Sequence, residues 1–189
     1  MYVSNNSLVP DPELEPSILT SKPREWFWMK SGIRMSSWSE SAVRFYMLGN
    51  PVIWWLGSLS IIINIIIIFT YRMCRIRKNY ITEEREQTVF EERVKVIVGA
   101  WAFNYLPFFA MGRVTYTHHY YPALVMSILS IGILLEHIIR QKERAYFLQY
   151  IVLGMSVIAF LYFSPFSYGM QGPLKLYAGR KILKSWNIV

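Results

Sequence analysis

The side chains best suited to chemistry lie together in the stretch GRVTYTHHYYPAL, at positions 112–124. The stretch holds one arginine, two adjacent histidines and three tyrosines, namely Arg113, His118, His119, Tyr116, Tyr120 and Tyr121. Such side chains can ligate a metal, transfer a proton, bind an anion or anchor a chain at a membrane surface. Their spacing and the charges nearby favour some of these chemistries over others.

The spacing of the histidines argues against a metal site. Adjacent residues on a helix point about 100° apart, so His118 and His119 cannot ligate one ion as an i, i+4 pair does. The remaining histidine, His137, would lie about 27 Å further along the same helix. Cys74 is the single cysteine of the chain and offers no partner thiol. We therefore expect neither a metal ion nor a metal cofactor.

A catalytic base within the stretch is also disfavoured, because a base needs an orienting partner and the stretch contains no Asp or Glu. Asp11 is the only aspartate of the chain. Anion binding remains, with Arg113 and the histidines as donors. Pro122 suits the first turn of a helix whose N-terminal amides would face the same ligand. The alternative is an aromatic belt at a membrane surface with one snorkelling arginine, and the residues alone favour neither.

Long apolar segments must position these groups. A helix that crosses a membrane needs roughly 20 consecutive, mostly apolar residues. The chain is 53% hydrophobic, and its charges avoid several runs of about that length. We predict an all-α, multi-pass membrane protein with a membrane domain over 51–164. Its four spans are predicted at about 51–71, 95–112, 119–139 and 146–164.

Two tails flank the predicted membrane domain. Residues 1–50 begin with a proline-rich part and continue into the aromatic-rich segment 25–48. That composition is typical of a segment lying on the membrane surface, and an element of a hydrophobic core is the alternative. Residues 165–189 form the second tail.

The positions of the cations predict an orientation. The loops 72–95 and 140–145 hold half of the 20 Lys and Arg residues, and loops rich in these residues usually face the cytoplasm. Both tails and the stretch 112–119 then lie on the lumenal side, together with the glycosylation sequon at Asn5. The net charge of +8 fits this juxtamembrane pattern, and we expect no nucleic-acid partner.

Three residues interrupt the predicted spans and are interpreted as structural. Asn64 would be costly in lipid without a partner, so we expect it to hydrogen-bond to a neighbouring helix. Pro107 frees a backbone carbonyl near Phe103 and predicts a kink beside Asn104. A polar cavity at that kink is the alternative.

Several motifs, taken together, resemble the C-terminal membrane region of the protein O-mannosyltransferases. They are LGNPVIWW (48–55), NYLPFFAMGRVTYTHHYYPAL (104–124), FSPFSYG (163–169), NNSLVPDPELEP (5–16), GIRMSSW (32–38) and the terminal LKSWNIV. The resemblance covers nearly the whole chain. It implies the C-terminal part of a GT-C type glycosyltransferase in the endoplasmic-reticulum membrane.

The resemblance also implies a reaction and its participants. Enzymes of this family transfer mannose from the lipid-linked donor dolichyl phosphate mannose to Ser or Thr of secretory proteins, and they act as dimers. Their catalytic Asp-Glu pair lies in the first lumenal loop and a MIR domain lies centrally, and neither is found in this chain. We therefore expect membrane lipid and a family member as partners, no catalytic residue in this chain, and little activity from the chain alone.

On this resemblance we assign Arg113, Tyr116, His118 and His119 to the binding of the donor phosphate. The alternative function is a non-catalytic membrane partner, or a degenerate remnant, that associates with intact family members.

Overall fold

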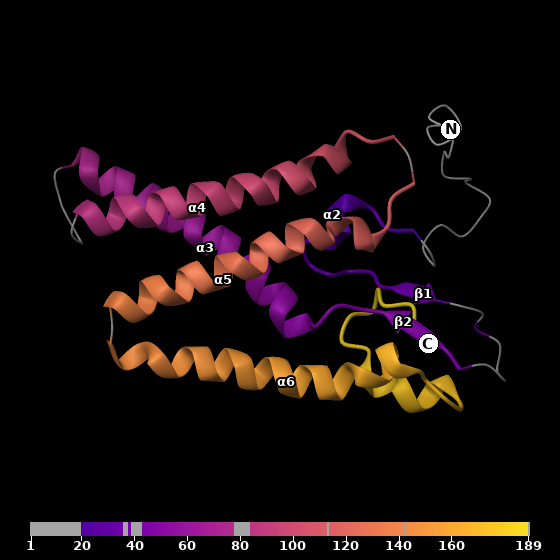
Figure 1. Ribbon diagram of the computed structural model, residues 1–189. Helices are drawn as coiled ribbons and strands as arrows, with labels where there is room; N and C mark the ends of the chain where they lie inside the picture. Colours follow the sequence, from indigo (N-terminus) through magenta and orange to yellow (C-terminus); the bar gives the residue numbers. More distant parts are fainter. Residues whose placement is uncertain are drawn as a thin grey trace.

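The computed structural model describes residues 20–35, 38, 43–77, 84–112, 114–141 and 143–188. Four long helices run along the molecule, and the short elements gather mostly at one end of them (Figure 1). The long helices are α3 (Pro51–Ile76), α4 (Glu84–Tyr105), α5 (Tyr121–Gln141) and α6 (Phe147–Tyr168). The short elements are α2 (Pro23–Trp26), β1 (Ile33–Met35), β2 (Phe45–Met47) and the 3-10 helices η1 (Leu106–Phe109), η2 (Thr117–Tyr120), η3 (Glu143–Tyr146) and η4 (Leu174–Arg180).

The predicted helical membrane fold is confirmed, whereas the number of spans is approximate. Among the described residues, three helices are long and apolar enough to cross a membrane: Pro51–Ile76, Thr117–Arg140 and Phe147–Tyr168. The predicted second span, 95–112, corresponds to the apolar C-terminal half of α4 followed by η1. The N-terminal half of α4 is charged, so this helix extends well beyond the segment that was predicted from apolar residues alone.

The helix ends follow from local chemistry. Asn50 caps α3, because its Oδ1 accepts the N–H groups of Val52 (3.1 Å) and Ile53 (3.4 Å). Pro51, the first residue of the helix, has no N–H group that would need a partner. The amide Nδ2 of Asn50 donates to the carbonyl of Ser156 at 2.9 Å, so the same cap fastens α3 to α6. Pro107 has no N–H and disfavours the helical conformation of the residue before it, so the chain tightens into η1 after Tyr105.

Small residues allow α3 and α5 to approach closely. A Cβ added at Gly57 would lie 2.6 Å from Oγ of Ser127. One turn further on, Ser60 Oγ donates to the carbonyls of Gly57 (2.8 Å) and Ser127 (3.3 Å). Asn64 Nδ2 then donates to the carbonyl (3.1 Å) and to Oγ (2.8 Å) of Ser130. Without water in the membrane, these contacts satisfy polar groups and hold the two helices in register.

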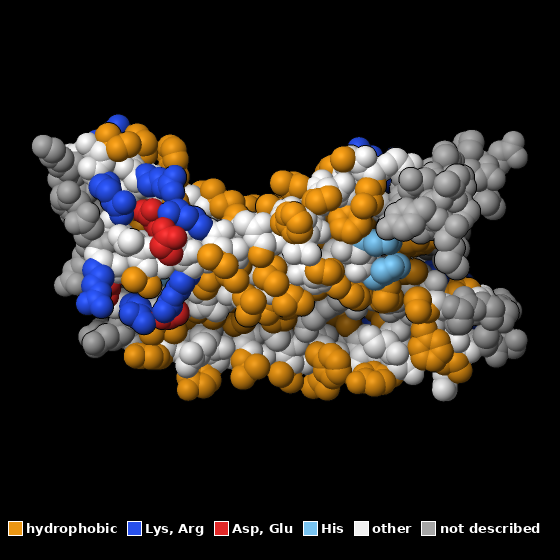
Figure 2. Space-filling view, turned by 45° about the horizontal axis from the view of Figure 1, so that its top comes forward, with side chains coloured by type: hydrophobic (Ala, Val, Ile, Leu, Met, Phe, Trp, Pro, Cys, Tyr) orange, Lys and Arg blue, Asp and Glu red, His pale blue; other side chains and the backbone are white. Residues whose placement is uncertain are grey.

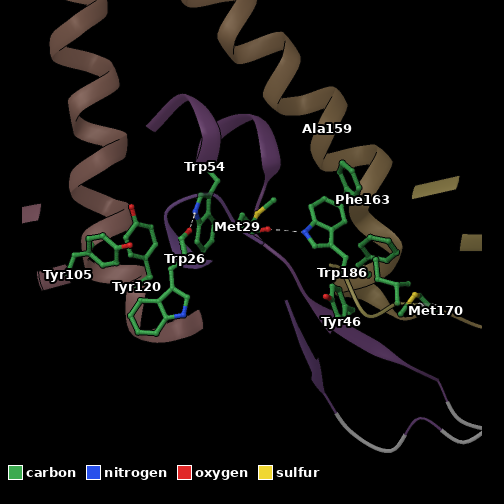
Figure 3. Packing of buried hydrophobic residues seen from close by; sticks show 13 residues of the cluster. Trp26, Met29, Tyr46, Trp54, Tyr105, Tyr120, Ala159, Phe163, Met170 and Trp186 are labelled. Atoms are coloured by element: carbon green, nitrogen blue, oxygen red, sulfur yellow. Dashed lines mark hydrogen bonds between the residues drawn. The ribbon is translucent and has the colours of Figure 1, made fainter. Parts of the chain in front are cut away.

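The two ends of the helices differ in composition. The end that we call the aromatic end holds the main core, where the side chains of Trp26, Trp54, Tyr120 and Trp186 are almost completely buried (Figure 3). At the opposite end, which we call the charged end, most of the Lys, Arg, Asp and Glu side chains visible in Figure 2 gather. Salt bridges at this end join Glu91 to Arg72 and Arg75. Others join Glu136 to Arg93 and Arg140.

The aromatic-rich segment 25–48 is divided between core and surface. Trp26, Met29 and Tyr46 are buried, whereas Trp28 and Phe45 are 39% and 37% exposed. Strands β1 and β2 pair antiparallel within this segment, with Ile33 opposite Met47. The assignment of the segment to a membrane surface remains a prediction.

Candidate functional site

The stretch 112–124 lies at the aromatic end and connects η1 to α5 (Figure 1). Arg113 and Asn5 lie outside the described residues, so their predicted roles remain predictions. Of the other predicted site residues, Tyr116, His118 and His119 lie together in and before η2. Asn64 and Asn104 lie apart from them, within α3 and α4.

A local turn fixes the orientation of His119. Tyr116 has an extended backbone, and its carbonyl accepts the N–H of His119 at 3.0 Å. The ring Nδ1 of His119 lies 3.1 Å from the N–H of Tyr116 and 3.0 Å from its carbonyl oxygen. With the ring proton on Nε2, Nδ1 accepts the Tyr116 N–H, and Nε2–H becomes available to a ligand as a donor.

Three rings of the stretch form a stack. The ring centroids of Tyr116 and His118 are 5.4 Å apart with an interplanar angle of 12°, and those of His118 and His119 are 4.5 Å apart at 23°. His119 also stacks on Trp26, with centroids 6.2 Å apart. Because the two imidazoles face each other, their lone pairs do not converge on one point. Within the described ranges, no group of three or more His, Cys, Asp or Glu could hold a metal ion.

Hydroxyl groups join the stretch to the chain near residue 21. Ser21 and Thr115 exchange two hydrogen bonds, from Ser21 N–H to the Thr115 carbonyl (2.9 Å) and from Thr115 Oγ1 to the Ser21 carbonyl (2.6 Å). The hydroxyls of Ser21 and Thr117 lie 3.0 Å apart, and the indole of Trp26 donates to Ser21 Oγ at 2.8 Å. These residues were missed from the sequence. The alternation of Thr115 and Thr117 in an apolar setting is the only signal that points to them.

The backbone of the segment 23–29 is satisfied by side chains from distant parts of the chain. Five of its carbonyl groups each accept one side-chain donor. The pairs are Tyr105 Oη to Pro23 (2.8 Å), Trp54 Nε1 to Trp26 (2.6 Å), Ser58 Oγ to Phe27, Trp55 Nε1 to Trp28 (3.0 Å) and Trp186 Nε1 to Met29 (2.9 Å). The short helix α2 leaves most of these carbonyls without a local donor, although the Trp26 carbonyl also accepts the N–H of Met29 at 3.0 Å. A buried carbonyl without a donor would be costly. These bonds hold the segment that carries Trp26, on which His119 stacks.

A cavity of about 480 Å³ opens beside the stretch. Lys22 and Arg24 supply positive charge to its lining, and Phe108 and Met111 supply apolar surface. Gly112 and Val114, on either side of Arg113 in the chain, also line it. This combination suits a ligand that carries both an anionic group and an apolar chain.

The polar residues of the helices make structural contacts. Asn104 Nδ2 donates to the carbonyl of Ala100, one turn earlier in α4, at 2.8 Å. Asn64 bridges α3 and α5 through Ser130 as described above. Pro107 lies in η1, where its missing N–H interrupts no α-helical hydrogen bond.

The hairpin beside the core contains a perturbed phenol. Burial raises the pKa of Tyr46 to about 12. Its hydroxyl accepts the N–H of Gly32 at 3.1 Å. A Cβ at Gly32 would approach the Tyr46 ring to 2.5 Å, so a glycine is required for this contact.

Comparisons with known proteins agree on one family. Residues 1–186 match a family model described as the C-terminal four TMM region of protein-O-mannosyltransferase. The chain is 35% identical over 199 residues to dolichyl-phosphate-mannose–protein mannosyltransferase 3 of Saccharomyces cerevisiae, covering 100% of this chain and 26% of that protein. It is 33% identical over 186 residues to protein O-mannosyl-transferase 2 of Danio rerio, covering 89% and 24%.

A solved structure shares the fold. A chain of the S. cerevisiae protein O-mannosyltransferase Pmt1-Pmt2 complex bound to the sugar donor matches with a TM-score of 0.83 and 28% sequence identity. The match covers 98% of this chain and 25% of that one. The chain thus spans about a quarter of the length of the relatives it matches.

Proposed function

Because the chain belongs to the protein O-mannosyltransferase family, as its C-terminal membrane region, we propose that it serves an enzyme that transfers mannose to secretory proteins. The donor is dolichyl phosphate mannose and the acceptors are Ser and Thr hydroxyls. The enzyme acts in the endoplasmic-reticulum membrane as a dimer with a family member. In this arrangement the aromatic end is lumenal and the charged end is cytoplasmic, as the distribution of cations favours.

The observation that carries this proposal is the arrangement of His118 and His119 at the aromatic end. The exposed His118 stacks on the half-buried His119, which stacks on Trp26 and contacts Phe108, a residue that lines the cavity together with Lys22 and Arg24. Transfer of mannose leaves dolichyl phosphate as the leaving group, and cationic or N–H donors held in place stabilise the charge that develops there. Arg113, Tyr116, His118 and His119 are proposed to hold this phosphate.

The base that accepts the proton of the Ser or Thr hydroxyl is proposed to come from another part of the enzyme. Glu25, the carboxylate described at the aromatic end, accepts the backbone N–H of Lys22 at 2.8 Å and so caps the short helix α2. This contact gives Glu25 a structural task. The chain is therefore proposed to supply donor binding and the lumenal scaffold, with the catalytic carboxylates supplied by the rest of the enzyme.

A chimera tests the proposal. The C-terminal quarter of the S. cerevisiae relative, dolichyl-phosphate-mannose–protein mannosyltransferase 3, is replaced by this chain. Transfer of labelled mannose from dolichyl phosphate mannose to a Ser/Thr peptide is then measured in microsomes. We expect the chimera to transfer more mannose than the relative that lacks its C-terminal quarter. Arg113→Ala in the chimera should lower transfer at least tenfold, since a charge-assisted hydrogen bond contributes about 1.5–3 kcal/mol.

Two results would contradict the proposal. A chimera that inserts and dimerises normally but transfers no mannose would support the non-catalytic partner instead. Unchanged donor affinity and transfer in both Arg113→Ala and His118→Ala would remove the phosphate-binding role from this stretch.

A further inference from the structure

A second cavity, of about 360 Å³, lies at the charged end between α4 and α5. Charged side chains of both helices form its rim: Arg85, Glu86 and Arg93 from α4, and Glu136 and Arg140 from α5. The rest of its lining consists of Val89, Phe90, Ile133 and His137. The cavity lies at the opposite end of the helices from the proposed donor site and is separate from it.

The rim is held in place by a bridging carboxylate. Glu136 accepts a hydrogen bond from Arg93 at 2.8 Å and another from Arg140 at 2.7 Å, which joins α4 to α5. The side chains of Arg93 and Arg140 are still 49% and 59% exposed. Each guanidinium has five N–H donors in a fork, so donors remain available beyond the bond to Glu136.

The charged residues of the rim carry a net charge of +1. Three arginines, Arg85, Arg93 and Arg140, face two glutamates, Glu86 and Glu136. Within the part of the chain that the structure describes, no salt bridge engages Arg85. A phosphodiester carries one negative charge, which neutralises this excess.

The position of the cavity favours a lipid headgroup as the molecule that carries the phosphate. Arg140 ends the apolar helix Thr117–Arg140, so the rim lies at the depth of lipid headgroups when this helix crosses a membrane. Ile133, one turn before Glu136 in α5, lies on the bilayer side of the rim, and Val89, which is 45% exposed, lies among the charged residues of α4. Basic pockets between helices on the cytoplasmic side are suited to anionic headgroups. A zwitterionic lipid would bring a second, cationic group close to the arginines.

We propose that this cavity binds the headgroup of an anionic glycerophospholipid from the leaflet at the charged end. The phosphodiester contacts Arg85, Arg93 and Arg140, the glycerol group lies against Val89, and an acyl chain extends into the bilayer past Ile133. The lipid fastens α4 to α5 at the end where α4 is too charged to be held by burial alone. Mannose transfer is not required for this binding.

Native mass spectrometry of the full chain, released from detergent micelles with phosphatidylglycerol or phosphatidylcholine added, tests the proposal. We expect one phosphatidylglycerol to bind tightly and phosphatidylcholine to bind at least tenfold more weakly. Arg85→Gln should weaken phosphatidylglycerol binding about tenfold, the loss of one charge-assisted contact. Arg77→Gln is the matched control, because Arg77 is an exposed arginine just after α3 that does not line the cavity.

A variant that should strengthen lipid binding distinguishes a ligand-binding site from a purely structural salt bridge. Glu136→Gln frees Arg93 and Arg140 and adds one positive charge to the rim, so it should strengthen phosphatidylglycerol binding. Equal losses in Arg85→Gln and Arg77→Gln, or weaker binding in Glu136→Gln, would overturn the proposal. Displacement of the lipid by millimolar inorganic phosphate would show a site for free phosphate and overturn the lipid as its source.

Discussion

Trp54 and Trp26 are joined by a hydrogen bond of 2.6 Å from the indole Nε1 of Trp54 to the backbone carbonyl of Trp26. Both side chains are almost completely buried. The bond links α3, an apolar helix, to the segment that supports the stacked histidines. The aromatic core therefore contains a buried hydrogen bond, and a substitution that keeps the aromatic ring can remove this bond.

Replacing Trp54 by Phe removes this donor and keeps an aromatic ring. The Trp26 carbonyl also accepts the N–H of Met29 at 3.0 Å, so it is left only partly satisfied. We expect a loss of about 1–2 kcal/mol in the free energy of unfolding. Thermal unfolding in detergent, followed by circular dichroism, measures it. Trp55→Phe is the control and should cost less, since the bond of Trp55 to the Trp28 carbonyl is exposed.

Replacing Gly57 by Ala tests the close approach of α3 and α5. The added Cβ would lie 2.6 Å from Ser127 Oγ and 3.1 Å from its Cβ, so the helices must separate. We expect a destabilisation of about 1–3 kcal/mol, as for overpacking elsewhere. At Gly132 in α5 nothing lies within 4 Å of an added Cβ, and Gly132→Ala should leave the melting temperature equal or slightly raised. Similar melting temperatures for the two variants would refute the packing argument.

The two adjacent histidines should differ in what they contribute. His118 is exposed, so His118→Ala in the chimera should lower kcat/KM about tenfold, the loss of about one hydrogen bond to a charged group, with an unchanged melting temperature. His119 packs against Trp26 and Phe108, so His119→Ala should lower the melting temperature as well. Radiolabel transfer and thermal melting on the same preparations measure both effects. A drop in stability with His118→Ala and none with His119→Ala would reverse the assignment.

The buried phenol of Tyr46 predicts a dependence on alkaline pH. Its pKa is raised from 10.0 to about 12, so the unfolded chain loses this proton at lower pH than the folded chain. The stability that this group contributes is complete below pH 10 and is lost as the pH rises toward about 12. Ultraviolet difference spectra should show a late-ionising phase, and Tyr46→Phe should reduce its amplitude by that of one tyrosine. Tyr162→Phe, at an exposed tyrosine, should leave the late phase in place.

The membrane helices were predictable because each depends on a local property of the chain. The apolar run after Pro51 defines α3 within a few residues. The charged half of α4 follows from its charge pattern, since Glu84 and Glu86 near its start and Arg93 and Lys95 further on suit the dipole of a helix that runs into the second span. Packing of Phe90 and Val94 against Tyr71 helps to hold it as a helix.

The sequence indicated the residues of the candidate site but not their arrangement. Its two histidines were found by type, whereas their stacking depends on the extended backbone at Tyr116 rather than on a regular helix. The donors that hold the segment 23–29 come from Tyr105, Trp54 and Trp186, which lie far apart along the chain. No spacing rule connects them, because the fold alone brings them together. The charges around the second cavity are likewise far apart in the sequence: Arg85, Glu86, Arg93 and Arg140 fall in the two charged loops, and Glu136 falls in the third predicted span.

The bond from Trp186 to Met29 spans 157 residues and sets an order of events in biosynthesis. The acceptor emerges from the ribosome before any of the long helices, and the donor emerges after α6. The support beneath His119 is therefore completed only after the last helix has been threaded into the bilayer. Until then the surface proposed to meet the donor lipid lacks one of its supporting hydrogen bonds.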